Sequence, residues 1–439
     1  MGAINSVRRL TIQCLGLLEA LEPTPVEIAS KIDATADMQH RVQEKWPHLT
    51  LVPFGSSENG FGCSSSDLDL GLFFESHMDM DTLSWTDRLQ ILASVASIVT
   101  QDPHVTMKQF ICHARVPLIK LWNDHRKLAI DISIGSPMAR RNTLLLKRYG
   151  ECDPRVRPLV FAVKHWAKQR GINDASNGSL SSYAWIMLVI FFLQTRRVVP
   201  CLRVDDDVVR GADSPRGPSL DPHDDTDMEA SCDRPMRGRP DESVGSLLAA
   251  FFHFYAWEFD HRNNVVSIRC GQALPKQGKW GLGLGTWRFS IEDPIELHHD
   301  VARVIFHPKG QQRLVDELRR AAGMALLPES QLDELCAPAA TDGCFICDQP
   351  GHMPRDCTVE ATATLPPPAA CTTPTNVPQP PSLTPVVVVP VAPAAAAPHM
   401  QVVSPYDKVL AKKRPRRRSK SKGGAKKKLM VGLSTLISC

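Results

Sequence analysis

The sequence has no apolar run long enough to cross a membrane and no pattern of a disulfide-bonded secreted protein. The longest apolar run, Tyr183–Leu193, is too short to span a bilayer and predicts a buried helix. The first residues, MGAINSVRR, have no long apolar core of the kind found in secretory signals, so export is not expected. The 13 cysteines are an odd number and most stand alone, which favours a reduced intracellular compartment over a disulfide framework.

Strong charge is also lacking outside one segment. The formal net charge is +4, but residues 404–428 alone carry +11, which leaves −7 on the remainder. Residues 203–242, which are rich in Asp, Pro, Gly and Arg, carry −6 of that charge and predict a disordered acidic insertion. The presumed folded part is therefore close to neutral, and its global charge cannot supply affinity for nucleic acid.

Outside the acidic insertion and the basic segment, the chain is long enough for two packed domains. We expect an α+β protein with an N-terminal helix (1–30) that packs on a helical lobe, a small mixed α/β lobe (31–150) and a mainly helical lobe (151–330). Helical spacing predicts helices at 4–20, 38–46, 81–100, 155–170, 181–195, 243–259, 294–305 and 311–325. Besides the stretch described next, strands are expected at 105–111, 118–122, 126–134 and 265–269.

The stretch Pro53–Phe74, PFGSSENGFGCSSSDLDLGLFF, organises the rest of the chain. On a strand, Asp67 and Asp69 would share one face while the leucines between and after them share the other. Two carboxylates held this close call for a cation such as Mg²⁺, and the preceding Gly-Ser turn can aim N–H groups at a phosphate. Asp131, on the polar face of the LAIDISI strand, would be a solvated edge residue if it stood alone, but beside the other two it is a candidate third ligand.

A second metal site is predicted near the end of the presumed folded part. Cys344, Cys347, His352 and Cys357 have the spacing C-x₂-C-x₄-H-x₄-C, a complete set of zinc ligands for a structural knuckle within residues 342–359. Scattered free thiols are the alternative. Phe345 suits a knuckle that stacks an unpaired base. Residues 360–439 predict a disordered Pro-rich linker and basic tail, and for the tail a solvated charge run and a role in nuclear import or RNA tethering both stay open.

Several ordered motifs resemble those of a known family. They are PFGSSENGFGCSSSDLDL, LAIDISI, NTLLLKRY, VKHWAKQRGIND, GSLSSYAW, VGSLLAAFFHFYAWEFD and SIEDPIELHHDVARV. Together they resemble DNA polymerase β-type nucleotidyltransferases, in the branch of noncanonical poly(A) polymerases and terminal uridylyltransferases. The likeness covers about residues 1–357, and the CCHC motif makes it greatest to the zinc-knuckle terminal uridylyltransferases.

The resemblance implies an RNA 3′-terminal uridylyltransferase that holds UTP between a catalytic lobe and a helical lobe and releases pyrophosphate. It implies that Asp67, Asp69 and Asp131 bind two Mg²⁺ (or Mn²⁺) ions. It also implies nucleotide contacts from Gly55 and Ser56 at the triphosphate, Lys164, Lys168 and Ser182 at its β and γ phosphates, Asn142 at the ribose and uracil O2, and Tyr183 stacked on the base. By their spacing alone, the two lysines could be a solvated helix face and Tyr183 ordinary core packing.

The choice of base is carried by the same resemblance. In the family, a histidine in the EDP-containing loop donates to uracil O4 and crowds a purine, and His299 falls at that position in EDPIELHHDV. A matched buried donor is worth roughly 1 to 3 kcal/mol, or about one to two decades of preference. The departures from the family pattern are Ile295, where an aromatic residue is usual, and Asp300, where asparagine is usual.

The expected partners are UTP and single-stranded RNA 3′ ends, without a membrane. The expected location is cytoplasmic, and the basic tail permits nuclear entry. Two alternatives stay open: a poly(A) polymerase that uses ATP, and a catalytically silent RNA-binding adaptor that uses the knuckle and the tail.

Overall fold

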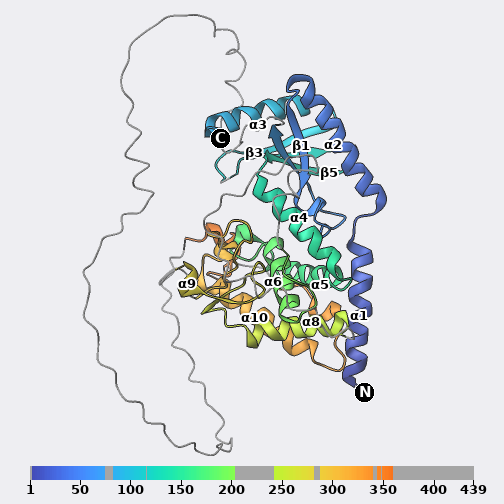
Figure 1. Ribbon diagram of the computed structural model, residues 1–439, viewed down its shortest axis with the longest axis vertical. Helices are drawn as coiled ribbons and strands as arrows, with labels where there is room; N and C mark the ends of the chain where they lie inside the picture. The colour runs from blue at the N-terminus through green and yellow to red at the C-terminus, as the bar shows by residue number, and fades with distance from the viewer. Residues whose placement is uncertain are drawn as a thin grey trace, which may run out of the picture. The chain divides into compact units, whose positions relative to one another are not determined.

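A computed structural model describes residues 2–74, 83–114, 116–202, 242–280, 287–339, 344–347 and 349–358. These residues belong to one compact unit, in which a sheet with its covering helices forms one lobe and a larger group of helices forms the other (Figure 1). The predicted acidic insertion, apart from Glu242, and the predicted linker and basic tail lie outside the described residues.

The first lobe is built on a five-stranded sheet of order β1-β2-β5-β4-β3. Its strands are β1 (Leu49–Phe54), β2 (Leu68–Phe74), β3 (Val105–Ile111), β4 (Leu118–Asn123) and β5 (Leu128–Ile134). Only the β2–β5 pair is parallel, and the other neighbours are antiparallel. The leucines of the DLDLGL stretch are buried, as their alternation predicts, and pack with residues of α2 (Pro25–Lys45) and α3 (Trp85–Val99).

Side-chain caps set where several helices begin. At α2, the Thr24 hydroxyl accepts a hydrogen bond from the Glu27 N–H, and the Glu27 carboxylate accepts one from the Thr24 N–H at 2.7 Å. At α3 the Ser84 hydroxyl accepts a hydrogen bond from the Asp87 N–H, so that this helix starts at Trp85 and not at the predicted residue 81. Free N–H groups at a helix start need such partners, and the sequence supplies them.

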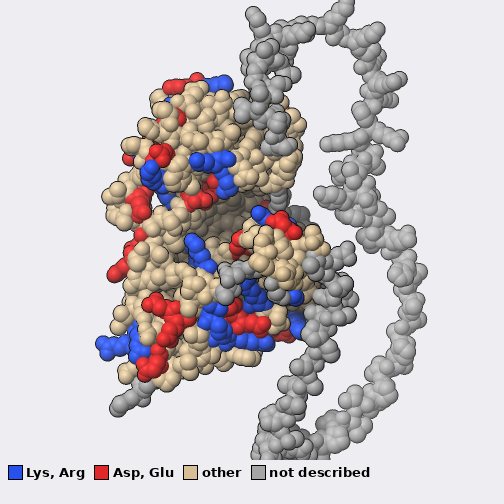
Figure 2. Space-filling view, turned by 180° about the vertical axis from the view of Figure 1, so that it is seen from behind, with Lys and Arg blue, Asp and Glu red and all other residues tan. Residues whose placement is uncertain are grey.

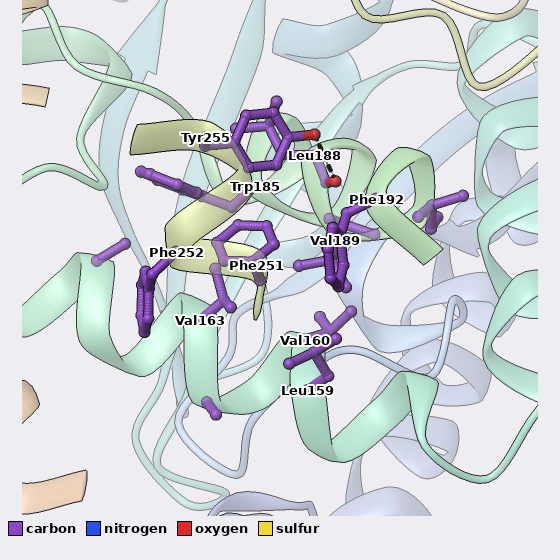
Figure 3. Close-up of a cluster of buried hydrophobic side chains, with 14 of the residues drawn as sticks. Leu159, Val160, Val163, Trp185, Leu188, Val189, Phe192, Phe251, Phe252 and Tyr255 are labelled. Atoms are coloured by element: carbon purple, nitrogen blue, oxygen red, sulfur yellow. Dashed lines mark hydrogen bonds between the residues drawn. The ribbon is translucent and has the colours of Figure 1, made fainter. Parts of the chain in front are cut away.

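The second lobe consists mainly of α1 (Gly2–Leu21), α4 (Pro137–Cys152), α5 (Val156–Gln169), α6 (Ser182–Thr195), α8 (Val244–His253) and α10 (Pro308–Ala325). Helix α6 is its centre, because every residue from Ala184 to Gln194 is buried. Trp185 packs edge-on against Trp166 with ring centroids 5.4 Å apart, and the Tyr255 hydroxyl donates to Leu188 O at 2.8 Å (Figure 3). Among the described helices, none combines the length and apolarity needed to cross a bilayer.

Helix α1 precedes the sheet in the sequence but packs in the helical lobe. Helix α1 packs on α5 and α8, and Leu10 and Cys14 on its inner face are fully buried. The Gly245 N–H, at the start of α8, donates to the Thr11 hydroxyl at 3.0 Å. Helix α4 then joins the end of the sheet to α5 and also contacts the short turn after β1.

Two local predictions were wrong, and one helix was missed. The predicted strand 265–269 is reduced to β6 (Asn264–Val265), which pairs with β7 (Leu274–Pro275), and to a single bridge between Val266 and Ile291. The predicted helix 294–305 is a loop that ends in a 3₁₀ turn, η6 (Val301–Val304), because the chain folds back on itself: the Asp293 N–H donates to His299 O at 3.0 Å and the Val301 N–H donates to Ile291 O at 2.9 Å. Helix α4 was not predicted at all. The 243–259 prediction is right in extent, but its last turn, η5 (Phe254–Glu258), is π-helical.

Candidate functional site

Parallel pairing of β2 with β5 places two of the three predicted carboxylates next to each other. Asp69 lies opposite Asp131 in the register, while Asp67 precedes β2 and is exposed. Burial, followed by the negative charges of Asp131 and Asp67, raises the pKa of Asp69 to about 6. Carboxylates that repel one another in this way are suited to a hard divalent cation such as Mg²⁺, so the donor set fits that metal.

Two lysines that the sequence did not point to flank this cluster. Lys120 lies opposite Asp131 in the β4–β5 pairing, and its Nζ donates to Asp131 Oδ2 at 2.6 Å. Lys31, on α2, donates to Ser66 O at 2.7 Å and so fixes the loop that leads to Asp67. Both positive charges oppose the rise in the pKa of Asp69. They therefore supply part of the positive charge that the cluster needs.

The Gly-Ser turn lies directly beside the carboxylates. Gly55 has φ of +65°, and a Cβ added there would come within 2.8 Å of Asp69 Oδ2, so only glycine fits. Its N–H donates to the Thr143 hydroxyl of α4 at 2.9 Å. Ser56 follows in the short 3₁₀ turn η1 (Gly55–Ser57). The turn is thus held between the sheet and α4, next to the place predicted for the triphosphate.

The three residues predicted to contact the ribose and base converge on one carboxylate, Asp293. The Asn142 amide donates to its Oδ2 at 3.4 Å, the Tyr183 hydroxyl donates to the same atom at 3.3 Å, and His299 Nδ1 lies 3.9 Å from it. Burial alone would raise the pKa of Asp293, but the nearby His299 ring and the hydrogen bonds accepted from the N–H groups of Glu296 and Ile295, among others, lower it overall. Asp293 is therefore a charged hub that orients all three side chains.

The tyrosine and the histidine are held in different ways. Burial first, and then the charge of Asp293, place the pKa of Tyr183 far above its usual value, so the phenol keeps its proton. His299 Nδ1 faces both Asp293 and Glu296, at 3.9 and 3.7 Å. Nε2, on the other side of the ring, is the nitrogen left to meet a ligand. Asp300, which departs from the family pattern, accepts the N–H groups of Ile291 and Ala302 at 3.0 and 2.9 Å and shapes this loop.

The residues predicted for the β and γ phosphates have distinct surroundings. Lys164 is not on a solvated face, because its Nζ donates to Phe61 O at 2.5 Å and burial lowers its pKa. Lys168, one turn later, is exposed. The Ser182 hydroxyl, at the start of α6, accepts a hydrogen bond from Asn173 at 3.0 Å. The surface is hollowed between the two lobes, and both acidic and basic side chains lie at its edges (Figure 2).

The four predicted zinc ligands come together. Their ligand atoms all lie within 4.8 Å of one another, and Cys347 Sγ is 3.3 Å from His352 Nε2. Three thiols and an imidazole at this spacing fit a tetrahedral zinc ion. Among the described residues this is the only group of three or more His, Cys, Asp or Glu side chains whose ligand atoms are close enough to hold one metal ion. The carboxylate oxygens of Asp67, Asp69 and Asp131 do not all lie that close to one another.

Comparison with known protein families identifies three domains along the chain. Residues 10–151 match the central palm domain of mitochondrial-like poly(A) RNA polymerases, residues 243–299 match the Cid1 family of poly(A) polymerases, and residues 342–359 match a zinc knuckle. The chain thus contains a poly(A) polymerase-like palm domain, a Cid1-family domain and a zinc knuckle, the order expected from its resemblance to terminal uridylyltransferases and noncanonical poly(A) polymerases. The expected family, fold class and zinc-knuckle motif are thereby confirmed.

Members of both branches of this family are similar to the chain. Poly(A) RNA polymerase GLD2-A of Xenopus laevis is 31% identical over 72% of this chain and 60% of its own length. Terminal uridylyltransferase 4 of Homo sapiens is 32% identical over 66% of this chain but only 18% of its own length. The chain thus spans less than two thirds of these relatives. Solved structures of both kinds are also similar. Cid1 in complex with its short product ApU has a TM-score of 0.59 at 26% identity, and the match covers 76% of this chain and 99% of that one. The GLD-2/RNP-8 complex has a TM-score of 0.60 at 26% identity, and the match covers 75% of this chain and 98% of that one.

Proposed function

We propose that this protein adds uridylate from UTP to the 3′ ends of RNA. The observation that carries the proposal is the convergence of Asn142, Tyr183 and His299 on Asp293, which gives a preorganised site for one base. The same chain supplies paired carboxylates on β2 and β5 beside a Gly-Ser turn. A base site, a phosphate turn and a carboxylate cluster are the parts that nucleotidyl transfer requires.

In this reaction the RNA 3′ oxygen attacks the α-phosphorus of UTP, the bond from that phosphorus to the bridging oxygen of the β-phosphate breaks, and pyrophosphate leaves. Asp67, Asp69 and Asp131 would hold Mg²⁺. When bound, the metal would favour loss of the 3′ hydroxyl proton and offset the charge that develops on the phosphates. The Gly55 turn and Lys164 would hold the triphosphate, and an ionised carboxylate of the cluster can accept the hydroxyl proton.

Uridine selection is assigned to the loop that carries His299. Its Nδ1 is held by two acids, which leaves Nε2 to face the base. With Nδ1 donating to the acids, Nε2 is a donor only when the ring carries both protons. That donor would match uracil O4 and would meet the amino group of adenine unfavourably, an effect of roughly 1 to 3 kcal/mol.

ATP use is the second candidate, because relatives named poly(A) RNA polymerases match this chain at the same level of identity as the uridylyltransferases. The two candidates share the carboxylate chemistry and differ only at the base site. The experiment therefore has to test the base directly.

A single-nucleotide extension assay tests the proposal. Purified protein is given a labelled single-stranded RNA, Mg²⁺ and one nucleoside triphosphate at a time. We expect extension with UTP to exceed extension with ATP by about one to two decades. Efficient extension with ATP alone would contradict uridylation in favour of poly(A) synthesis, and no extension with any nucleotide would favour the RNA-binding adaptor.

Two variants locate the selectivity and the chemistry. His299→Ala should reduce the ratio of UTP to ATP use, whereas His298→Ala, which changes the exposed neighbouring histidine, should leave it unchanged. Asp69→Ala should abolish extension. If Asp69→Ala extends RNA as well as the wild type does, the proposed carboxylate site is wrong.

A further inference from the structure

The zinc knuckle is docked on the helical lobe through one face of α10. Lys309 Nζ donates to Ile346 O at 2.6 Å, inside the knuckle. The Phe345 ring lies against Gly310, where an added Cβ would come within 3.3 Å of it, and the Arg313 guanidinium lies 6.0 Å from its centroid. Cys344 and Ile346 are buried in this contact region. The aromatic ring predicted to stack on RNA is thus in part engaged by the protein itself.

The other side of the knuckle meets the connection between α5 and α6. The knuckle turn η7 (Pro354–Asp356) contacts η3 (Ala175–Asn177), which lies in that connection. The Cβ position of Gly310 is also 3.0 Å from Gly178 O, so α10, the knuckle and the connection meet at one glycine. A larger residue at 310 would push two of the three apart.

This connection carries residues assigned above to the nucleotide. It begins shortly after Lys168 and leads into Ser182 and Tyr183, and the Asn173 side chain ties it to Ser182 at 3.0 Å. A cavity of about 720 Å³ opens here, and Lys168 and Asn173 line it together with Phe345, His352 and Met353 of the knuckle. The knuckle and the phosphate end of the proposed nucleotide site therefore share one wall.

We propose that the zinc knuckle braces the α5–α6 connection, so that the folded knuckle strengthens binding of a nucleoside triphosphate even when no RNA is present. The inference rests on the proposed nucleotide site and adds a second role for the knuckle besides RNA contact. A CCHC segment this short depends on zinc for its fold, so an ion held by Cys344, Cys347, His352 and Cys357 would keep Ile346 O and the Phe345 ring in place against α10. Lys309 and Phe345 act as positioning residues, because they reach the nucleotide only through this contact.

The test measures binding of UTP and ATP to the full-length, zinc-loaded protein by calorimetry without RNA. Lys309→Met and Phe345→Ala should each raise the dissociation constant of the preferred nucleotide about three- to tenfold, while zinc content stays at about one ion per chain. Arg355→Met is the matched control, since Arg355 is an exposed knuckle cation whose carboxylate neighbour is Asp356, 3.6 Å away. It should leave nucleotide affinity unchanged.

Amide hydrogen exchange provides a readout besides affinity. Peptides that cover residues 173–182 should exchange faster in Lys309→Met than in the wild type, while peptides of β2 keep their rates. If both docking variants weaken RNA binding but leave nucleotide affinity and exchange at 173–182 unchanged, the knuckle serves RNA alone and the inference is overturned. If the wild type binds neither nucleotide, the nucleotide site itself is wrong, and the inference falls with it.

Discussion

The raised pKa of Asp69 predicts how the stability of the lobe built on the five-stranded sheet depends on pH. The ordinary pKa of this carboxyl is 3.8, and burial together with Asp131 and Asp67 raises it to about 6 in the folded protein. Between these values the native state binds more protons than the unfolded chain, so the free energy of unfolding falls as pH rises. Above about pH 6 the full penalty is present, and the shift corresponds to about 3 kcal/mol.

Replacing this carboxyl with a neutral isostere removes the penalty. Metal-free Asp69→Asn should therefore be more stable than the wild type by about 3 kcal/mol at pH 7, and by less than about 1 kcal/mol at pH 4, where the native carboxyl is protonated. Mg²⁺ should stabilise the wild type at pH 7 but have a smaller effect on the variant, which has lost a ligand. Such a gain in stability at a position that we propose to be catalytic is expected where like charges are held together for function at a cost in stability.

Amide hydrogen exchange of β2 and β5 measures this effect locally, with wild type and variant compared at the same pH so that intrinsic exchange rates cancel. Asp124→Asn is the control, because this exposed carboxylate pairs with Lys127 at 2.8 Å and should give no gain at pH 7. A difference between Asp69→Asn and wild type that is the same at pH 4 and pH 7 would refute the electrostatic reasoning. So would a wild type that is better protected than the variant at pH 7 without metal.

Three further perturbations test other parts of the molecule. Lys120→Met should tighten direct Mn²⁺ binding several-fold, because the metal no longer competes with the 2.6 Å ion pair to Asp131, and Lys120→Arg should restore the wild-type value; weaker binding in Lys120→Met would contradict this. Ending the chain after residue 403 removes a net charge of +11 contributed by residues 404–428, and should lower both RNA affinity and its salt dependence; an unchanged slope of affinity against salt would exclude tail contacts. Tyr255→Phe should lower the free energy of unfolding by about 1 kcal/mol in urea titrations, because the buried hydroxyl donates to Leu188 O, and a change near zero would show that this bond adds nothing net.

Features with a local period were predictable from the sequence. The alternating leucines of β2 and the alternating isoleucines of β5 identified buried strands with carboxylates on the other face, and β3 was predicted with its observed bounds, Val105–Ile111. The zinc ligands were equally accessible, because all four lie within one short segment. In these cases the information needed was contained in a few neighbouring residues.

Features set by register were not predictable in that way. Lys120 matters because the β4–β5 pairing places it opposite Asp131, and neither strand specifies that register by itself. Asp293 lies within one of the family motifs, but its role depends on Asn142 of α4 and Tyr183 of α6, which donate hydrogen bonds to it. Lys120 and Asp293 each carry a charge in a partly buried site. The partners of each charge come from other segments of the chain, and a single sequence does not show which segments meet.

The missed helix and the false one have local causes. Helix α4 buries Thr143, Leu145, Leu146 and Tyr149 at helical spacing and has Pro137 in its first turn, so its pattern was present in the sequence, although charged residues surround it. In the loop after Asp293 the apolar spacing suggested a helix, but the two ends of the segment pair with each other through the Asp293 N–H, which donates to His299 O, and the bridge between Glu292 and Asp300. These backbone bonds close a tight turn, and periodicity over so short a segment does not reveal them.

The packing of α1 against α8 implies a delay during synthesis of the protein between the translation of α1 and its final packing. The bond from Gly245 to Thr11 joins residues 234 positions apart, so α1 leaves the ribosome long before α8 exists to cover it. At roughly 5 to 20 residues per second, the interval is about 10 to 50 seconds. During that time Leu10 and Cys14, fully buried in the finished fold, have no α8 to pack against and are available to chaperones or to another nascent chain. Helix α1 thus reaches its final packing only after α8 has been translated.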